Sequence, residues 1–340
     1  MTEFTELIPG LPEELALECL SRLYFSTHRV AARVCSRWRS LFQSRDFYYQ
    51  RKLTGHTRKV ACLVQLLPVQ AGSDRLKPTS PPAYGVSIYD PVSGAWDRIN
   101  PVPKYPNGLP LFCQLASSEG KLVLMGGWDP ASYDPVRDVF VYDFTTRRWR
   151  QGRDMPEARS FFAAGEVGGR VFVAGGHDES KNALSSAWAY DVAADEWAEL
   201  PRMSQERDEC EGLVIGSDFW VVSGYRTETQ GGFVASAERF DSAAGEWRCV
   251  EDAWVASRCP RSNVGVGKDG RLFCWAESES AVRVGACGIE LGGRTYVSGS
   301  NCQGGSPEFF MVEGQNGKFM RIEVPDEFLR FVQSGCCVEV

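Results

Sequence analysis

Residues 170–197 read RVFVAGGHDESKNALSSAWAYDVAADEW, and this stretch decides the fold. A short apolar run ends in Gly175-Gly176, and a Tyr-Asp pair follows that precedes a Trp by seven residues. The aromatic-Asp pair and the Trp occur four times, with successive Trp residues 53, 48 and 50 positions apart. The pairs begin at Tyr89, Tyr142, Tyr190 and Phe240, and the tryptophans are Trp96, Trp149, Trp197 and Trp247. This shared register indicates an internal repeat.

Each repeat contains four short apolar or alternating runs separated by turn residues, which predicts four antiparallel strands. A Gly-Gly pair at the end of the second strand permits positive φ and a close backbone approach near a crowded axis. The repeated aromatic side chains are expected to pack between neighbouring sheets. A four-stranded antiparallel unit that recurs at this period is a propeller blade. The predicted fold class is therefore a small all-α module followed by an all-β propeller.

The fifth repeat departs from this pattern. Residues 263–267 and 271–276 predict its first two strands, but only residues 277–281 stand where the outer hairpin belongs. We predict six blades with the fifth incomplete, and five blades are the alternative. Four prolines in residues 68–83 predict a long loop inside the first blade, which also lacks a first strand. The predicted units are 57–100, 108–151, 158–200, 206–250, the partial 260–277 and 281–325, and residues 331–340 supply the closing strand of the first blade.

The first 56 residues have helical rather than strand periodicity. Pro12 and the acidic residues after it suit a helix N-terminus, and apolar positions recur at helical spacing up to Leu23. Thr27 predicts the N-cap of a second helix that reaches Phe42, and residues 44–53 predict a third. Residues 1–60 hold 10 Lys and Arg against 6 Asp and Glu, whereas the remainder holds 27 against 38. A basic helical module thus precedes an acidic body, which argues against nucleic-acid binding by the body.

The composition excludes several classes of protein. The 340 residues have a net charge of -7 and contain no apolar stretch of about 20 residues, so we expect no membrane span. The twelve cysteines include no Cys-x-x-Cys and the three histidines are far apart, so we expect free thiols, no metal site and no cofactor. The start MTEFTELIPG lacks a secretory signal, and the expected location is cytoplasmic or nuclear.

The Gly-Gly, Tyr and Trp pattern resembles kelch repeats. The pattern Leu11-Pro12-x-Glu14-Leu15 with Val34-Cys35-x-x-Trp38 resembles the F-box, and the whole chain resembles plant F-box/kelch-repeat proteins. The resemblance implies that the helices bind the Skp-type adaptor of an SCF-type cullin-RING ubiquitin ligase, and that the propeller binds a client protein. The implied client classes are phenylpropanoid enzymes such as phenylalanine ammonia-lyase, or cytokinin response regulators. The adaptor-binding set that we predict is Leu11, Pro12, Leu15, Cys19, Leu20, Leu23, Val30, Val34, Trp38 and Leu41.

Client binding is expected on one face of the propeller. In antiparallel blades, the loops that follow the second strand and those that precede the first emerge on the same side. Aligning the repeats places four arginines at one position before the first strand, where they would grip an acidic segment or a phosphate. The alternative is that each arginine pairs with a nearby acid for structural reasons. The predicted client-binding set is Trp128, Asp129, Arg159, His177, Asp178, Arg207, Tyr225, Arg226, Arg261 and Arg283.

No catalytic constellation is evident in the sequence. Residues 265–270 match G-x-G-x-x-G, but a strand-like run follows where a dinucleotide site requires a helix. The leading hypothesis is a non-catalytic substrate receptor that acts through its protein partners, without nucleic acid or membrane. The alternatives are a kelch scaffold outside the ubiquitin pathway and a small-molecule propeller enzyme.

Overall fold

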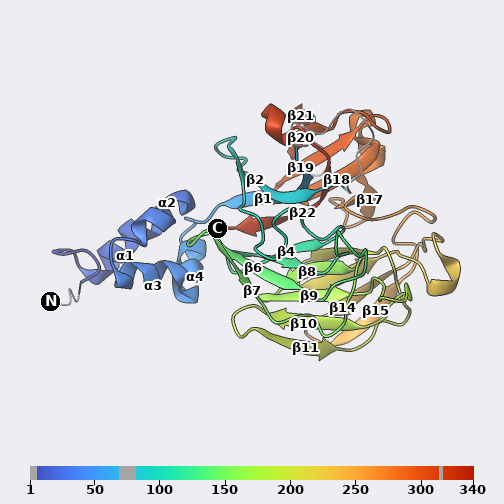
Figure 1. The fold of residues 1–340 in the computed structure, drawn as a ribbon, viewed down its shortest axis with the longest axis horizontal. Helices are drawn as coiled ribbons and strands as arrows, with labels where there is room; N and C mark the ends of the chain where they lie inside the picture. Colours follow the sequence, from blue (N-terminus) through green and yellow to red (C-terminus); the bar gives the residue numbers. More distant parts are fainter. Residues whose placement is uncertain (1–5, 69–81, 314–316) are drawn as a thin grey trace.

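The computed structural model describes residues 6–68, 82–313 and 317–340, and it confirms the predicted fold class. A module of four helices precedes a β-propeller (Figure 1). Most of the loop predicted over residues 68–83 lies outside the described residues. No helix in the described part of the chain is long and apolar enough to span a membrane. The helices of the module are α1 (Glu13–Ser21), α2 (Phe25–Ala31), α3 (Ser36–Gln43) and α4 (Arg45–Leu53).

The single helix predicted from Thr27 to Phe42 is wrong, because the chain forms α2 and α3 there. Cys35 has extended backbone angles, φ -155° and ψ 169°, and it caps α3. Its Sγ accepts the backbone N–H of Trp38 at 3.4 Å. The cap satisfies a free amide at the start of α3, and a new helix therefore begins at this point. The apolar periodicity nevertheless continues across the boundary between the two helices.

Five four-stranded sheets form the complete blades in the described residues, which agrees with the five-bladed alternative. The fifth unit of the sequence contributes only a two-stranded hairpin. The first blade has the strand order β22-β1-β2-β3, and the other complete blades follow the chain order. Its strands are β1 (Lys59–Leu66), β2 (Tyr84–Tyr89), β3 (Trp96–Arg98) and β22 (Val332–Glu339). The second and third blades contain β4 (Gln114–Ser118), β5 (Lys121–Met125), β6 (Val139–Asp143), β7 (Arg148–Gln151), β8 (Ala163–Val167), β9 (Arg170–Ala174), β10 (Ala187–Asp191) and β11 (Glu196–Leu200). The remaining strands are β12 (Glu211–Ile215), β13 (Asp218–Val222), β14 (Ala237–Asp241), β15 (Glu246–Val250), β16 (Val264–Val266), β17 (Leu272–Cys274), β18 (Val284–Glu290), β19 (Arg294–Ser300), β20 (Glu308–Glu313) and β21 (Phe319–Arg321).

The hairpin β16–β17 stops where a short helix, α5 (Trp275–Ser278), begins directly after it. The side chain of Trp275 is buried against β18, where Gly288 leaves room for the indole. The aromatic side chain thus fills space beside the next blade, and the chain passes to β18 without an outer hairpin. Residues of the hairpin still line the central channel together with the inner strands of the five complete blades.

Three of the four repeated tryptophans join their blade to the segment that follows the blade before it. In the third blade, the rings of Tyr190 and Trp197 stack with centroids 4.7 Å apart. The Trp197 indole N–H donates to the carbonyl of Arg153, in the segment that follows the second blade, at 2.9 Å. Trp149 and Trp247 make the same kind of bond, to Asn100 and Pro201 at 2.7 Å. The spacing of the tryptophans therefore reflects a contact between blades as well as packing within each blade.

The Gly-Gly pairs are required by close backbone approaches. Gly175 and Gly176 have φ values of +68° and +81°. A Cβ at Gly175 would lie 2.6 Å from the carbonyl oxygen of Arg207 in the next blade, which a larger residue cannot tolerate.

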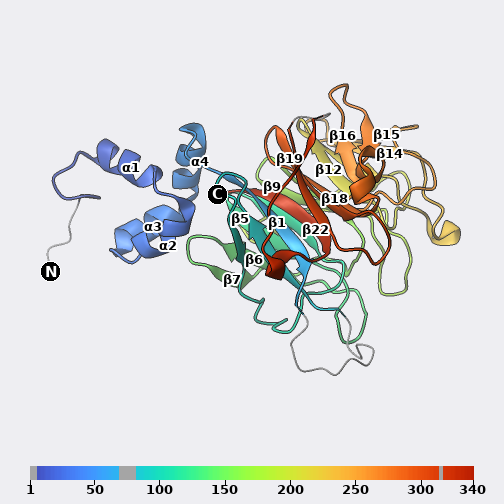
Figure 2. The same ribbon diagram turned by 90° about the horizontal axis from the view of Figure 1, so that it is seen from above.

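The ring closes where β22 pairs antiparallel with β1 (Figures 1 and 2). Gly335 lies opposite Leu63 in this ladder, and a Cβ at Gly335 would lie 2.6 Å from the carbonyl oxygen of Cys62. It would also meet the Ile289 side chain at 2.5 Å. The closing strand therefore has no space for a larger residue at this position.

Gly335→Val is expected to lower the free energy of unfolding by about 1–3 kcal/mol, because the added atoms overpack the closing ladder. Urea unfolding of the full chain measures this change. Cys337→Val, two residues along the same strand, is the matched control and should cost less than about 1 kcal/mol. Equal stability of the Gly335 variant and the wild type would contradict the steric account.

Candidate functional site

The helical module exposes large apolar side chains. Leu15, Val30 and Val34 are 55%, 68% and 64% exposed. Pro12 and Cys19 of the predicted adaptor-binding set are also exposed. These five residues lie on α1, on α2 and in the segments beside them. These five residues form the accessible part of the predicted set. Uncovered valine and leucine side chains on a small module favour contact with a partner.

The other members of that set belong wholly or partly to the core of the module. Leu20 is 2% exposed and packs inside the module, so the prediction that it contacts an adaptor is wrong. Half-buried side chains packed against the same core are Leu11, Leu23, Trp38 and Leu41. The Trp38 indole N–H donates to the carbonyl of Leu7 at 2.7 Å. Helical periodicity identified apolar residues, but it did not separate this core from the exposed surface.

The module is fixed to the propeller through the turns within blades. The Glu119 carboxylate, in the turn between β4 and β5, accepts hydrogen bonds from Arg45 Nε at 2.6 Å and Tyr49 OH at 2.8 Å. Lys52 forms an ion pair with Glu339 of the closing strand at 3.1 Å. These turns lie on the opposite face of the propeller from the loops predicted to bind a client. The module therefore leaves that loop face uncovered (Figure 1).

The four arginines aligned before the first strands are Arg159, Arg207, Arg261 and Arg283, and two of them are structural. Arg159 and Arg207 are fully buried, so the prediction that they contact a client is wrong. Arg159 donates to the carbonyl of Gly175 at 3.0 Å and to the carboxylate of Glu157 at 2.7 Å, and burial lowers its pKa to about 10. Arg207 donates to the carbonyl of Ser223 at 2.7 Å and to Glu238, itself fully buried, at 3.2 Å. Both guanidinium groups hold strands and loops together from inside the fold.

The other two arginines occupy different positions. A residue with positive φ stands two places before the first strand of each of four units, at Phe112, Phe161, Glu209 and Ser262. In this register Arg261 is one residue later than Arg159 and Arg207, and this offset corrects the predicted alignment. Its guanidinium lies over the rings of Phe161 and Phe112, 4.2 and 4.8 Å from their centroids. Arg283 is exposed directly before β18, next to a hollow formed with Glu277 and Glu279.

An aromatic cluster occupies the loop face between the second and third blades. Phe112 stacks on Phe161 at 4.3 Å, and Trp128 meets Phe161 edge-on at 5.2 Å. His177, 3% exposed, accepts the Trp128 indole N–H on Nε2 at 3.1 Å. Its Nδ1 lies 2.9 Å from the carboxylate of Asp208. The structure thus brings the predicted Trp128 and His177 together.

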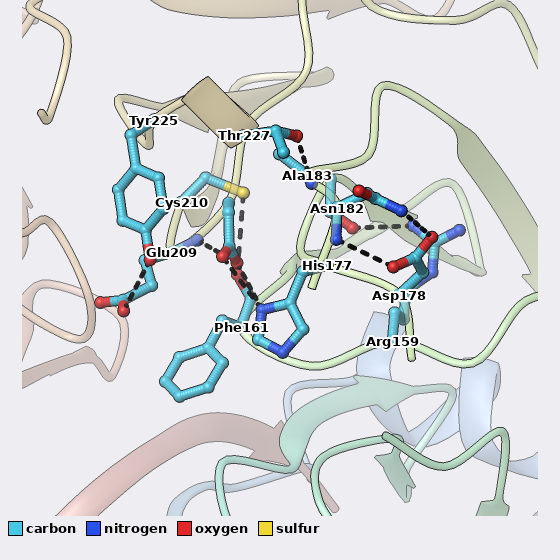
Figure 3. Close-up of polar contacts among 12 residues, drawn as sticks. Arg159, Phe161, His177, Asp178, Asn182, Ala183, Glu209, Cys210, Tyr225 and Thr227 are labelled. Atoms are coloured by element: carbon cyan, nitrogen blue, oxygen red, sulfur yellow. Dashed lines mark hydrogen bonds and ion pairs between the residues drawn. The ribbon is translucent and has the colours of Figure 1, made fainter. Parts of the chain in front are cut away.

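The other predicted client-binding residues lie in neighbouring loops. Asp129 accepts the backbone N–H of Ala131 in its own loop at 2.8 Å. Asp178 likewise accepts the backbone N–H of Asn182 at 2.9 Å (Figure 3). Tyr225 is buried, and its hydroxyl donates to Glu209 at 3.0 Å (Figure 3). Arg226 is exposed and bonds to Gln205 at 2.9 Å. His177 and Tyr225 are buried, so the prediction that they contact a client is wrong, and they support the surface from below.

Sequence reasoning missed several residues of this face. Phe112, Phe161, Asp208 and Glu209 were not predicted as site residues, and neither was Lys181, whose ammonium lies 3.8 Å from the Trp128 ring centroid. The signal that could have found three of them is their shared place just before the first strand of each unit. The residue types do not predict the positive φ at these positions, and this backbone angle changes the direction of the side chains.

The central channel, of about 510 Å³, contains a carboxyl group with a perturbed pKa. Glu211 accepts the backbone N–H of Ser262, and burial raises the pKa of its carboxyl group from an ordinary value of 4.5 to about 7. Within the described residues, no three His, Cys, Asp or Glu side chains are grouped so that they could hold a metal ion.

Glu211→Gln is expected to stabilise the protein at alkaline pH. The folded state binds the proton of the Glu211 carboxyl group more tightly than the unfolded state does. Stabilisation of the wild type by this proton is therefore complete below about pH 4.5 and is lost as the pH rises to about 7. Urea unfolding should show a gain of about 1–2 kcal/mol at pH 8 and a smaller gain towards pH 5. The same gain at both pH values would show that ionisation of Glu211 is not its cause.

Arg207→Met should destabilise the protein by about 3–5 kcal/mol, because it leaves the Glu238 carboxylate buried without its partner. Thermal and urea unfolding measure this loss, and Arg207→Met/Glu238→Gln should recover part of it. Arg261→Met, at the surface, is the control and should cost less than about 1 kcal/mol. An unchanged free energy of unfolding for Arg207→Met would refute the structural role of Arg207.

Comparison with known proteins matches both parts of the chain. The F-box domain model matches residues 8–50, and the Kelch motif model matches residues 111–156 and 158–204. F-box/kelch-repeat protein SKIP20 of Arabidopsis thaliana is 40% identical over 319 residues, which cover 81% of this chain and 75% of the relative. F-box/kelch-repeat protein At1g15670 of the same plant is 36% identical over 358 residues, which cover 98% and 100% of the two chains. The protein therefore belongs to the family of F-box/kelch-repeat proteins.

Proposed function

We propose that this protein is the substrate-recognition subunit of an SCF-type cullin-RING ubiquitin ligase. The F-box binds a Skp-type adaptor, and the loop face of the propeller binds a client protein for ubiquitylation and proteasomal degradation. The observation that carries the proposal is the exposed apolar set Leu15, Val30 and Val34 on a module matched by the F-box model. The module docks on the face opposite the client loops, so both partners have access at the same time.

The protein has no catalytic step of its own in this mechanism. It accelerates ubiquitin transfer by holding the client near a ubiquitin-charged enzyme, which replaces a bimolecular encounter by a local one. The bonds from Arg45 and Tyr49 to Glu119, together with the Lys52–Glu339 pair, support a fixed orientation of the F-box relative to the propeller. The same proposal locates the protein in the cytoplasm or nucleus.

The client belongs, in this proposal, to one of the two classes implied by the family resemblance, a phenylpropanoid enzyme or a response regulator. A ligase reconstituted with the full chain and supplied with phenylalanine ammonia-lyase or a cytokinin response regulator separates them. Polyubiquitin chains should form on one class and should require the full chain. If neither substrate is modified while the adaptor binds, both client assignments are wrong and the receptor role stands.

Leu15→Asp and Val34→Asp should each weaken binding to a purified Skp-type adaptor by roughly tenfold or more, because they place a charge in an apolar interface. Isothermal titration calorimetry measures the affinity. Val92→Asp is the matched control, since Val92 is 66% exposed but lies on the propeller, and it should bind like the wild type. Absence of adaptor binding by the wild-type chain would sink the proposal and favour a scaffold or an enzyme outside the ubiquitin pathway.

A further inference from the structure

The loop face carries a pair of cations on an aromatic surface. We define the aromatic platform as Phe112, Trp128 and Phe161, whose rings contact one another. Lys181 Nζ lies 3.8 Å from the centroid of the Trp128 ring. The Arg261 guanidinium carbon lies 4.2 Å from the centroid of the Phe161 ring. Each cation is held by the negative face of a ring, which fixes its position without neutralising its charge.

These two charges are only partly compensated within the chain. Lys181 is exposed and has no carboxylate partner among the residues that the structure describes. Two acids face Arg261. The closest atoms of Glu209 and Arg261 are 3.7 Å apart. Burial raises the pKa of the Glu211 carboxyl group, and the charge of Arg261 opposes this larger effect by lowering that pKa. The Glu209 carboxylate also accepts the Tyr225 hydroxyl at 3.0 Å and the Cys259 thiol at 3.8 Å. Lys181 therefore has no carboxylate of its own in the described part of the chain, and Arg261 shares Glu209 with a tyrosine and a cysteine, so both cations can take a carboxylate from a partner.

Other acids near the platform are already engaged. Asp178 accepts the backbone N–H groups of Ser180 and Asn182, both at 2.9 Å, and these bonds lower its pKa against the opposing effect of burial. Asp208 bonds to His177 and to the backbone N–H of Glu209 at 2.8 Å. Asp178 thus bonds within its own loop, Asp208 bonds to His177 and to its own chain neighbour, and neither forms an ion pair with Lys181 or Arg261 among the described residues.

The orientation of Trp128 is fixed from behind. An indole nitrogen only donates hydrogen bonds, so His177 Nε2 must be the acceptor of the 3.1 Å bond between the two side chains. The ring proton of His177 is then on Nδ1, where it is donated to Asp208 at 2.9 Å. Asp208 and His177 thus act as positioning residues that hold the indole in place while the half-buried Trp128 keeps an accessible surface.

We propose that Lys181 and Arg261 recognise a client segment in which a carboxylate side chain lies next to an apolar one. The carboxylate pairs with the cations of this surface, and the apolar side chain packs against the aromatic platform beside them. This inference rests on the proposed receptor function for the identity of the partner as a client. It replaces the binding site of four aligned arginines expected from the sequence, since two of those arginines are buried and structural.

Selection from a displayed library of random short peptides tests the recognition chemistry. The full chain is used with and without a bound Skp-type adaptor. Enriched peptides should carry Asp or Glu next to an aromatic or aliphatic residue. Synthetic copies of an enriched peptide with Glu, Gln or phosphoserine at that position are then compared. Changing Glu to Gln should weaken binding by roughly tenfold.

Charge reversal tests the residues themselves. Lys181→Glu/Arg261→Glu should lose the preference for acidic peptides and acquire one for Lys or Arg. Arg202→Glu is the matched control, because Arg202 is exposed in the segment between β11 and β12 on the same face and is not part of the predicted client-binding set. It should keep the acidic preference. Lys181→Gln/Arg261→Gln, a milder change, should weaken binding of the Glu peptide by roughly tenfold and tests the assignment if the reversed variant does not fold.

Several outcomes would overturn the inference. These are the absence of acidic enrichment by the wild type, equal binding of the Glu and Gln peptides, or an unchanged preference after charge reversal. Much tighter binding of the phosphoserine peptide would overturn the assignment of a carboxylate. Adaptor affinity measured on the same preparations separates this failure from failure of the receptor function, because the adaptor surface lies on the helical module.

Discussion

The antiparallel pairing of β22 with β1 is the interaction on which the rest of the structure depends. It places Val60 opposite Val338 and joins the last strand of the chain to the first, so the ring cannot open without breaking this ladder. Arg58 and Val340 exchange backbone hydrogen bonds of 2.8 Å in both directions, where the chain leaves the helical module. Lys52 reaches Glu339 at the same place. The closure of the ring and the attachment of the F-box therefore both depend on the end of β22.

The repeated residues then propagate this order around the ring. Each tryptophan of the second to fourth blades anchors its outer strand to the segment behind it, as Trp197 does through the carbonyl of Arg153. Buried arginines add a second link, since Arg159 and Arg207 cross-connect loops at the inner edge of their blades. A closed disc of this kind can present two separate surfaces, with the F-box attached to one face and the loops proposed to bind a client on the other.

Most of the fold could be predicted from the sequence because its determinants are local and repeated. The Tyr190 to Trp197 spacing, the Gly175-Gly176 pair and the short fifth unit all identify features of the propeller. The candidate site was less predictable. Arg159 and Arg261 look equivalent in an alignment, but a shift of one residue before a positive-φ turn makes one a core residue and the other a surface residue. The break between α2 and α3 escaped detection because a cysteine cap lacks a strong sequence signal.

Amide hydrogen exchange of the full chain, with and without a Skp-type adaptor, tests most directly the claim that adaptor and client use opposite faces. The account predicts that the adaptor slows exchange within residues 11–41, while the loops that carry Trp128, Lys181 and Arg261 exchange as before. Protection of those loops by the adaptor, or no protection in the helices, would contradict it.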